Sequence, residues 1–318
     1  MPYATFDQLT EQLVQHFQNQ RYAEALELIM AQGDNFPESR IWADYWKMVS
    51  AARLENRQLV YEVARKSLED GLWYGEFLWR QSPSYAPLQG DPEFEQIVAD
   101  SLLAQFRDTP STEPIVITKL PSNHSVQSPL LIALHGNQST AERTLPFWEP
   151  AVLDGWVTVI PQSDQVMFKN AFAWDDVEKS IAYVESQYEA LDIPFDSKHV
   201  VIAGHSMGGL IAIRMALQGL LPVRGFVVNG PAVPYVDQPE ALDSLLAPAR
   251  ELGLRTYFIL GEQDNAINTP EIKNLAEKLI AAGIACEVES VPDSTHDYNP
   301  AYDAALRRGL AFVNSGDT

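Results

Sequence analysis

The chain has 318 residues, of which 46% are hydrophobic and 20% charged, a balance typical of soluble globular proteins and a length above that of an average single domain. Its net charge of −21 is spread over the whole chain without a basic patch, which argues against nucleic acid or an anionic membrane as a partner. The sequence also lacks an apolar run of about 18 residues, a signal-peptide pattern at its start and a second cysteine beside Cys286, so we expect a cytoplasmic protein without a membrane span or a disulfide.

Residues 1–108 carry the pattern of a helical domain. Apolar residues recur at spacings of three and four in four segments, FDQLTEQLVQHF, YAEALELIMA, RIWADYWKMVSAARL and QLVYEVARKSLEDG. Residues 34–37 separate the second segment from the third, as clusters of turn residues do. Residues 19–22 recur loosely as residues 56–59, and helix pairs that repeat at such intervals resemble tetratricopeptide repeats, although three or more units of about 34 residues are usual.

The predicted helical domain allows two roles. It is either a cap that packs on the neighbouring domain and shapes it, or a binding module for a peptide, a protein or a second copy of the chain, as stacked helices often are. Its aromatic residues fit the core of the domain better than a ligand site. The sequence alone leaves both roles open.

The period of the pattern changes after residue 108. Residues 109–114 form a proline-punctuated linker, and residues 115–318 alternate strand and helix patterns. Short, mostly β-branched runs predict strands at residues 115–120, 130–134, 156–160, 200–203, 224–228, 256–260 and 285–291. Helices are expected at residues 175–190, 207–218, 239–251 and 270–282. The alternation predicts an α/β fold, a mostly parallel sheet covered by helices on both faces, preceded by the all-α helical-hairpin domain.

Gly204-His205-Ser206-Met207-Gly208 stands between a predicted strand and a predicted helix. That context is the one required for a nucleophile elbow, in which the serine hydroxyl is lifted above the sheet. Glycines on both sides let the strand and helix backbones approach each other closely, and a helix N-terminus favours negative charge beside the serine. We therefore expect Ser206 to be a nucleophile.

A serine nucleophile needs a base, and the base needs an acid that orients it. His296 follows the last predicted strand and Asp264 follows the strand before it, so both stand at the sheet edge where parallel sheets bind ligands. Their order along the chain after the serine is the one that accompanies such elbows. We predict His296 as the base and Asp264 as the acid. Four other carboxylates remain alternatives for the acid: Glu262, Asp237, Asp293 and Asp297.

An oxyanion formed at the serine needs two hydrogen-bond donors. The backbone N–H of Met207 is one candidate, because this residue follows the nucleophile directly. The loop after the strand at residues 130–134 offers the other candidate. Gly136 permits a close backbone approach in that loop, and Asn137 is the first choice as donor, with Gln138 second.

Six side chains near the expected site are candidates for the walls of a substrate pocket. The two histidines among them are interpreted first as packing or bracing residues. The aromatic residues belong to two loops at the same sheet edge, where they either line a pocket or lie buried under the loops. The six candidates are His135, His205, Phe147, Trp148, Phe172 and Trp174. A modest apolar pocket would favour short-chain or aromatic esters over long lipids.

Residues 115–313 resemble the α/β-hydrolase superfamily, most closely its phospholipase/carboxylesterase and polyester-depolymerase-like esterase branches. The resemblance rests on LHGNQ, GHSMGG, GEQDN and the late His296, which occur in the order and at the distances of that superfamily. It implies a serine carboxylesterase that cleaves a small-molecule ester through an acyl-enzyme on Ser206, without a metal or another cofactor. Asn137-Gln138 departs from related thioesterases, which often have a Gly- or Leu-containing loop at this place.

Two alternatives to an esterase stay open. One is a peptidase or thioesterase that uses the same three catalytic residues. The other is an interaction protein whose N-terminal helices bind a partner and whose hydrolase domain is weak or inert. The complete set of candidate residues counts against an inert domain, because inert relatives typically lack one of them.

Overall fold

The computed structural model describes residues 3–108, 115–234 and 239–315, so the predicted linker at residues 109–114 lies outside the described residues. The chain divides into two compact units. The first contains Met1–Glu113 and also Val166–Asn170, and the second contains Pro114–Gln165 and Ala171–Thr318. Within the described ranges, no helix is long and apolar enough to cross a membrane.

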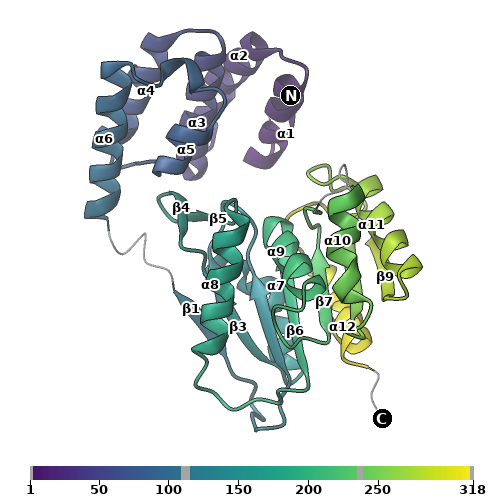
Figure 1. The fold of residues 1–318 in the computed structure, drawn as a ribbon. Helices are drawn as coiled ribbons and strands as arrows, with labels where there is room; N and C mark the ends of the chain where they lie inside the picture. The colour runs from purple at the N-terminus through teal and green to yellow at the C-terminus, as the bar shows by residue number, and fades with distance from the viewer. Residues whose placement is uncertain (1–2, 109–114, 235–238, 316–318) are drawn as a thin grey trace. The chain divides into compact units, whose positions relative to one another are not determined.

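The first unit is helical, as the pattern of residues 1–108 predicts (Figure 1). Its helices are α1 (Phe6–Gln18), α2 (Tyr22–Gln32), α3 (Arg40–Arg53), α4 (Arg57–Glu69), α5 (Glu76–Gln81) and α6 (Pro92–Arg107). Short 3-10 turns occur at Gly33–Asn35, Pro37–Ser39 and Ala86–Leu88. The first two of these turns fall at the predicted break between the second and third helical segments.

Local sequence explains where several of these helices begin. The side chains of Thr5, Asn56 and Asp91 accept hydrogen bonds from first-turn N–H groups of α1, α4 and α6, which satisfies donors that a helix leaves free. Pro92 occupies the first position of α6, where a missing N–H costs nothing. The apolar stripes of α1, α2 and α3 then meet in a common core. The apolar residues spaced by three and four are therefore on the buried faces of these helices.

The described part of the second unit contains a seven-stranded sheet in the order β1-β3-β2-β6-β7-β8-β9. β1 runs antiparallel to β3, and the other neighbouring strands are parallel. The strands are β1 (Val116–Lys119), β2 (Leu130–Leu134), β3 (Val157–Pro161), β6 (Val200–His205), β7 (Gly225–Asn229), β8 (Arg255–Gly261) and β9 (Ala285–Val291). Each predicted strand is present to within two residues at either end.

Helices cover both faces of this sheet (Figure 1). One face packs on α8 (Val177–Glu189), α9 (Ser206–Leu217), α10 (Pro239–Ala249) and α11 (Thr269–Ala281). The other face packs on α7 (Ala141–Leu153) and α12 (Tyr302–Asn314). The predicted fold class, a mostly parallel sheet between two helical layers and preceded by helices, is confirmed.

Several elements lack a clear sequence signal. The pattern does not predict α7, α12, or the two-stranded sheet of β4 (Gln165–Phe168) and β5 (Ala171–Ala173). α7 contains Pro146 and Pro150, which ordinarily interrupt a helix because proline lacks an N–H and its ring crowds the preceding turn. β4 and β5 are too short for an alternating pattern to stand out.

The register of the parallel strands brings their C-terminal ends to one edge. His205 at the end of β6 pairs with Asn229 of β7, Asn229 pairs with Ile259 of β8, and Gly261 pairs with Val291 of β9. Loops that leave these strands therefore meet above a common edge, which is where parallel sheets bind ligands.

Candidate active site

Ser206 lies at the junction of β6 and α9, and its backbone φ is +52°. A positive φ is rare outside glycine and costs on the order of 1–3 kcal/mol, so the surrounding structure must impose it. Gly204 and Gly208 make the turn possible. A Cβ at Gly204 would lie 2.3 Å from the backbone of Gly208, and a Cβ at Gly208 would lie 2.2 Å from the carbonyl oxygen of His135. The sequence thus forms a sharp strand-to-helix turn with Ser206 at its tip.

Asp264 and His296 form a hydrogen-bonded pair beyond the last two strands. Asp264 follows β8 and is buried, and His296 lies in the loop after β9. His296 Nδ1 lies 2.8 Å from Asp264 Oδ2, and the other carboxylate oxygen accepts the N–H of Ala266 at 2.9 Å. Because a carboxylate only accepts, the neutral imidazole carries its hydrogen on Nδ1 and leaves Nε2 available as a base.

One close contact joins this pair to the elbow, and another joins it to the loop after β7. The ring centroids of His205 and His296 are 4.5 Å apart. Gly230 follows β7, and a Cβ there would lie 2.9 Å from Asp264 Oδ2 and 3.1 Å from His296 Nδ1. The loops after four neighbouring strands therefore bring Ser206, Asp264 and His296 to the same edge of the sheet.

The alternative carboxylates do not share this geometry. Within the described structure, three of them are exposed and make no hydrogen bond to His296: Glu262, Asp293 and Asp297. The fourth, Asp237, lies outside the described residues. Asp264 is thus the carboxylate that contacts the candidate base.

The loop after β2 approaches the serine from the neighbouring strand. A Cβ at Gly136 would lie 3.2 Å from Ser206 Cβ, so the loop comes this close only because glycine has no side chain. The side chain of Asn137 is fixed, because Nδ2 donates to Asp175 Oδ1 at 2.6 Å and Oδ1 accepts the N–H of Trp174 at 2.8 Å. The backbone N–H of Asn137 is the group that remains to donate to an oxyanion.

Gln138, the second choice for this donor, is unsuitable. Its N–H donates to the carbonyl oxygen of Phe172 at 2.8 Å, and its φ is +66°. The expectation for Gln138 is corrected because its donor is already used in holding the loop. Met207 remains suitable, since it is the second residue of α9 and the first N–H groups of a helix have no partner within the helix.

Part of the chain matches a known protein family. Residues 161–308 match the model of the dienelactone hydrolase family, and that range includes Ser206, Asp264 and His296. The second unit has an α/β-hydrolase fold. The fold predicted from the sequence is confirmed, and the match to the family model supports a hydrolase.

Solved structures share the fold. An uncharacterized protein from Bacillus cereus has 23% identity and a TM-score of 0.54, and the alignment covers 98% of this chain and 99% of that chain, so the likeness extends over both units. Esterase PE8 has 17% identity and a TM-score of 0.50, and its alignment covers 62% of this chain and 99% of that chain. No curated protein has a significant sequence match to the chain.

His135 braces the β2 loop of the hydrolase from within. It is fully buried, its Nδ1 lies 2.6 Å from the carbonyl oxygen of Gly136, and its Nε2 accepts the N–H of Ser163 at 3.0 Å. These partners fix the neutral ring with its hydrogen on Nδ1. His135 is therefore a bracing residue, and the expectation that it lines a pocket is corrected because no part of it is accessible to a substrate.

Three of the four aromatic pocket candidates are core residues of the hydrolase. Trp148, Phe172 and Trp174 are no more than 2% exposed, and the Trp174 indole N–H donates to the carbonyl oxygen of His135. They are corrected to core residues because they are buried: Trp148 lies in α7, Phe172 in β5 and Trp174 directly after β5. Phe147 differs: it is only partly buried, and its ring lies 4.8 Å from those of both His205 and Tyr298.

Tyr298 also belongs to this aromatic cluster, although the sequence pattern predicts no role for it. It stands two residues after His296, and its hydroxyl donates to Asp303 at 3.1 Å. The pattern His296-Asp297-Tyr298 gives no periodic signal, because all three residues lie in a loop. Only its nearness to the predicted base could have marked Tyr298 as a residue of the site.

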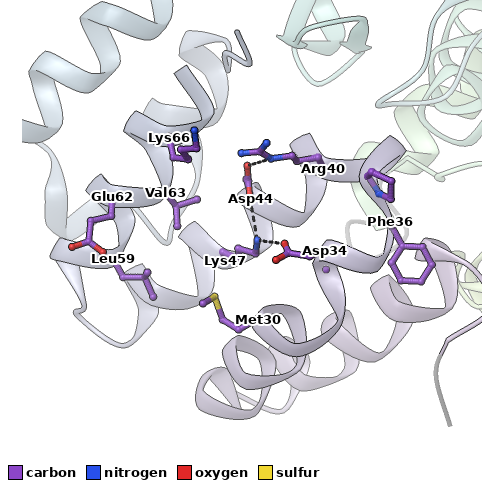
Figure 2. A pocket seen from close by; sticks show the side chains of 12 residues that line it. Met30, Asp34, Phe36, Arg40, Asp44, Lys47, Leu59, Glu62, Val63 and Lys66 are labelled. Carbon is purple, nitrogen blue, oxygen red and sulfur yellow. Dashed lines mark hydrogen bonds and ion pairs between the residues drawn. The ribbon is translucent and has the colours of Figure 1, made fainter. Parts of the chain in front are cut away.

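The helical unit contains a separate cavity of about 500 Å³ (Figure 2). Apolar side chains of Met30, Leu59 and Val63 share its lining with charged groups of α3 and α4, which include Arg40 and Lys47. Throughout the described ranges, no group of three or more His, Cys, Asp or Glu side chains could hold a metal ion.

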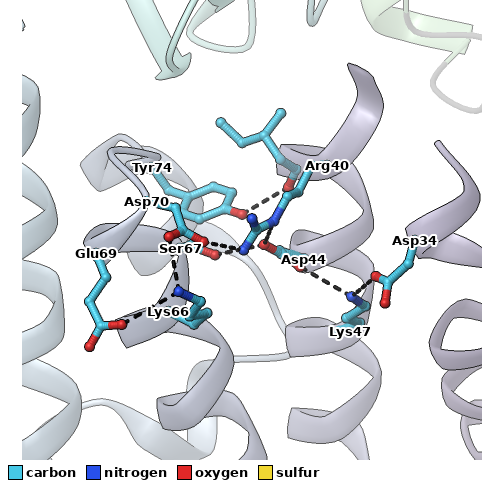
Figure 3. A network of polar contacts seen from close by, with 10 residues as sticks. Asp34, Arg40, Asp44, Lys47, Lys66, Ser67, Glu69, Asp70 and Tyr74 are labelled. Atoms are coloured by element: carbon cyan, nitrogen blue, oxygen red, sulfur yellow. Dashed lines mark hydrogen bonds and ion pairs between the residues drawn. The ribbon is translucent and has the colours of Figure 1, made fainter. Parts of the chain in front are cut away.

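The charged groups of this cavity bind one another (Figure 3). Asp44 of α3 is 4% exposed and accepts hydrogen bonds from Arg40, Lys47 and Ser67. Arg40 also pairs with Asp70, which caps α4, at 2.6 Å. A buried carboxylate is tolerated when cationic and hydroxyl donors surround it. The network links α3 to α4, and we assign it a structural role.

Proposed function

We propose that the protein is a serine esterase that hydrolyses carboxylic esters with short-chain or aromatic acyl groups. The observation that carries the proposal is the 2.8 Å hydrogen bond between His296 and Asp264, beside a serine held at positive φ where a parallel strand ends. The family match supports ester chemistry by its name, since a lactone is an internal ester.

In the acylation step, Ser206 Oγ attacks the ester carbonyl carbon while His296 Nε2 takes the hydroxyl proton. The Asp264 carboxylate holds the ring through Nδ1 and stabilises the imidazolium that forms. The backbone N–H groups of Met207 and Asn137 donate to the oxyanion of the tetrahedral intermediate. When this intermediate collapses, the bond to the leaving oxygen breaks, and His296 returns its proton to the departing alcohol.

In the deacylation step, water replaces the alcohol. His296 Nε2 removes a proton from water as the water oxygen adds to the acyl carbon. The second tetrahedral intermediate uses the same two N–H donors, and Ser206 leaves as it regains a proton from His296. The carboxylic acid is released with the enzyme in its starting state.

The surroundings of Ser206 favour a small acyl group. Phe147 is the one predicted pocket aromatic that is not covered, and it contacts His205 and Tyr298. Trp148, Phe172 and Trp174 are buried and offer no surface to an acyl chain. We infer that a flat aromatic or short aliphatic acyl group would pack against Phe147, since aromatic rings favour contact with one another.

The test is hydrolysis of p-nitrophenyl acetate, butyrate, octanoate and benzoate by the wild-type protein and by Ser206→Ala and Asp264→Asn. We expect wild-type turnover to be highest with acetate, butyrate or benzoate and lowest with octanoate. Ser206→Ala should fall to the background rate because the nucleophile is gone. Asp264→Asn should lose several orders of magnitude in kcat, because the amide favours the wrong tautomer of His296.

Circular dichroism on both variants serves as the control for folding. Equal rates of Ser206→Ala and wild type would refute the nucleophile. An active Asp264→Asn variant would instead move the acid to another carboxylate and leave the serine assignment in place. Faster turnover of the corresponding p-nitroanilides or thioesters than of the oxygen esters would favour a peptidase or a thioesterase.

A further inference from the structure

His205 occupies a defined position between the nucleophile and the candidate base. It precedes Ser206 as the last residue of β6. Its ring lies between two others: Phe147 is stacked on it at 4.8 Å with an interplanar angle of 26°, and His296 lies at 4.5 Å with an angle of 41°. On a third side, Gly136 leaves just enough space, because a Cβ there would lie 2.8 Å from His205 Nδ1.

A hydrogen bond ties His205 to the backbone of the candidate base. His205 Nε2 lies 2.9 Å from the carbonyl oxygen of His296. A carbonyl oxygen can only accept, so Nε2 carries a hydrogen and donates it. The neutral ring then has its lone pair on Nδ1, beside Gly136. The residue at one end of the elbow therefore holds the main chain of the loop that carries His296.

We propose that His205 is a positioning residue, which fixes the catalytic imidazole of His296 beside Ser206 by donating Nε2–H to the His296 carbonyl oxygen and by packing against its ring. The inference rests on the proposed function, because it names a device that serves the same site. It goes further in giving the residue before the nucleophile a specific task.

The device requires a neutral His205 throughout the reaction. His296 becomes an imidazolium in each half of the cycle, and a second positive ring at 4.5 Å would oppose that step. Burial, followed by the neighbouring positive charge of His296, lowers the pKa of His205 to about 3. His205 thus supplies an N–H donor without competing for the proton that His296 must carry.

Two substitutions distinguish the effect of the hydrogen-bond donor from the effect of a polar side chain without that hydrogen bond. His205→Gln places an amide N–H at nearly the reach of Nε2, whereas His205→Asn is one methylene shorter and cannot reach the His296 carbonyl oxygen. His205→Phe is a third variant, which keeps the ring and removes the donor. The full-length protein is used throughout, and kcat and KM are measured with p-nitrophenyl acetate.

We expect His205→Gln to retain kcat within about fivefold of wild type, and we expect His205→Asn and His205→Phe to lose on the order of ten- to a hundredfold, the range for a buried acceptor left unpaired. KM should change by less than about threefold in all three variants, since the substrate does not contact the lost hydrogen bond. If His205 had a purely structural role, the substitutions would reduce the amount of folded protein, and kcat per folded active site would stay unchanged.

Proton NMR provides a readout that does not depend on turnover. The low-field signal of the His296 Nδ1 proton in its hydrogen bond to Asp264 should persist in His205→Gln and broaden or disappear in His205→Asn. Equal kcat values for the Gln and Asn variants, or an unchanged signal in the Asn variant, would overturn the positioning role. The proposed function fails by a different result, namely activity in Ser206→Ala, so the two failures are distinguishable.

Discussion

Burial keeps His135 uncharged in the β2 loop. One of its ring nitrogens contacts the carbonyl oxygen of Gly136 in this loop and the other accepts the N–H of Ser163 after β3, and desolvation lowers the pKa of His135 to about 4 from an ordinary value of 6.5. A protonated ring would lose the acceptor that the Ser163 N–H uses. The loop conformation that brings Gly136 close to Ser206 therefore depends on a neutral imidazole.

This dependence predicts a pH effect on stability. Between pH 6.5 and about 4, His135 binds a proton in the unfolded chain but not in the folded chain. The stability that the neutral ring provides is therefore fully present above pH 6.5 and decreases as the pH falls toward about 4. The slope is up to about 1.4 kcal/mol per pH unit. Urea unfolding of wild type and His135→Gln at several pH values measures it. The variant should show the smaller slope, and identical slopes would contradict the effect.

At the residue scale, the sequence predicts candidate site residues better than it predicts hydrogen-bond partners. The positions of Ser206, Asp264 and His296 at one edge of the sheet are predictable because each stands in the segment that follows a strand pattern. The unsuitability of Gln138 is not predictable, because the partner of its N–H, the carbonyl oxygen of Phe172, lies in a hairpin that has no sequence signal. The sequence predicts which residues stand at the sheet edge and leaves open which donors there are already used.

The contact between β2 and α9 is the tightest requirement that the elbow places on two elements. A Cβ at Gly208 would lie 2.2 Å from the carbonyl oxygen of His135 and 2.8 Å from that of Leu134. Both atoms belong to the backbone of a central strand and its loop, so they cannot move aside as a flexible side chain would. The same close approach places the N-terminus of α9 beside the loop after β2.

Gly208→Ala tests this requirement. Helix propensity alone would stabilise the variant by about 1 kcal/mol, whereas the clash with backbone atoms should destabilise it by about 1–3 kcal/mol or more. We expect a lower free energy of unfolding in urea together with an esterase rate reduced at least tenfold, since the oxyanion donors shift. A variant that is more stable than wild type and fully active would show that the two elements are less tightly packed.

At the element scale, the strands are predictable because their runs are apolar, β-branched and bounded by turn residues. α7 is hidden by Pro146 and Pro150, although Thr140 caps its first turn by accepting the N–H of Arg143. Its apolar residues pack against the sheet and α12, and this tertiary burial outweighs the local penalty for proline. Helix propensity depends on the local sequence, whereas burial depends on the tertiary fold, which the local pattern does not predict.

At the scale of the whole molecule, the two units are not separate along the sequence. Val166–Asn170 belongs to the helical unit, although the sequence pattern places these residues in the second domain. Within that unit, the ring of Phe168 lies 4.5 Å from that of Trp42 and 6.1 Å from that of Tyr74. Phe168 is 2% exposed and Met167 is 5% exposed, so this short segment has an apolar environment that residues 1–108 provide.

Removal of residues 1–108 should therefore expose an apolar hairpin tip. Phe168 and Met167 lose the partners that bury them, and the loss of burial costs about 1.5–3 kcal/mol for each large side chain. We expect the truncated protein to aggregate or to unfold at a lower temperature than the full-length protein. The matched control is the same truncation with Phe168→Ser and Met167→Ser, which should recover solubility because the exposed tip becomes polar.

The truncation also separates the two roles of the helical unit. Loss of esterase activity in the soluble, serine-substituted truncation would favour a cap that shapes the hydrolase. A truncated chain that stays soluble without the serine substitutions and keeps the wild-type rate would contradict the cap. The helices would then be better explained as a binding module, because they would contribute neither to stability nor to turnover.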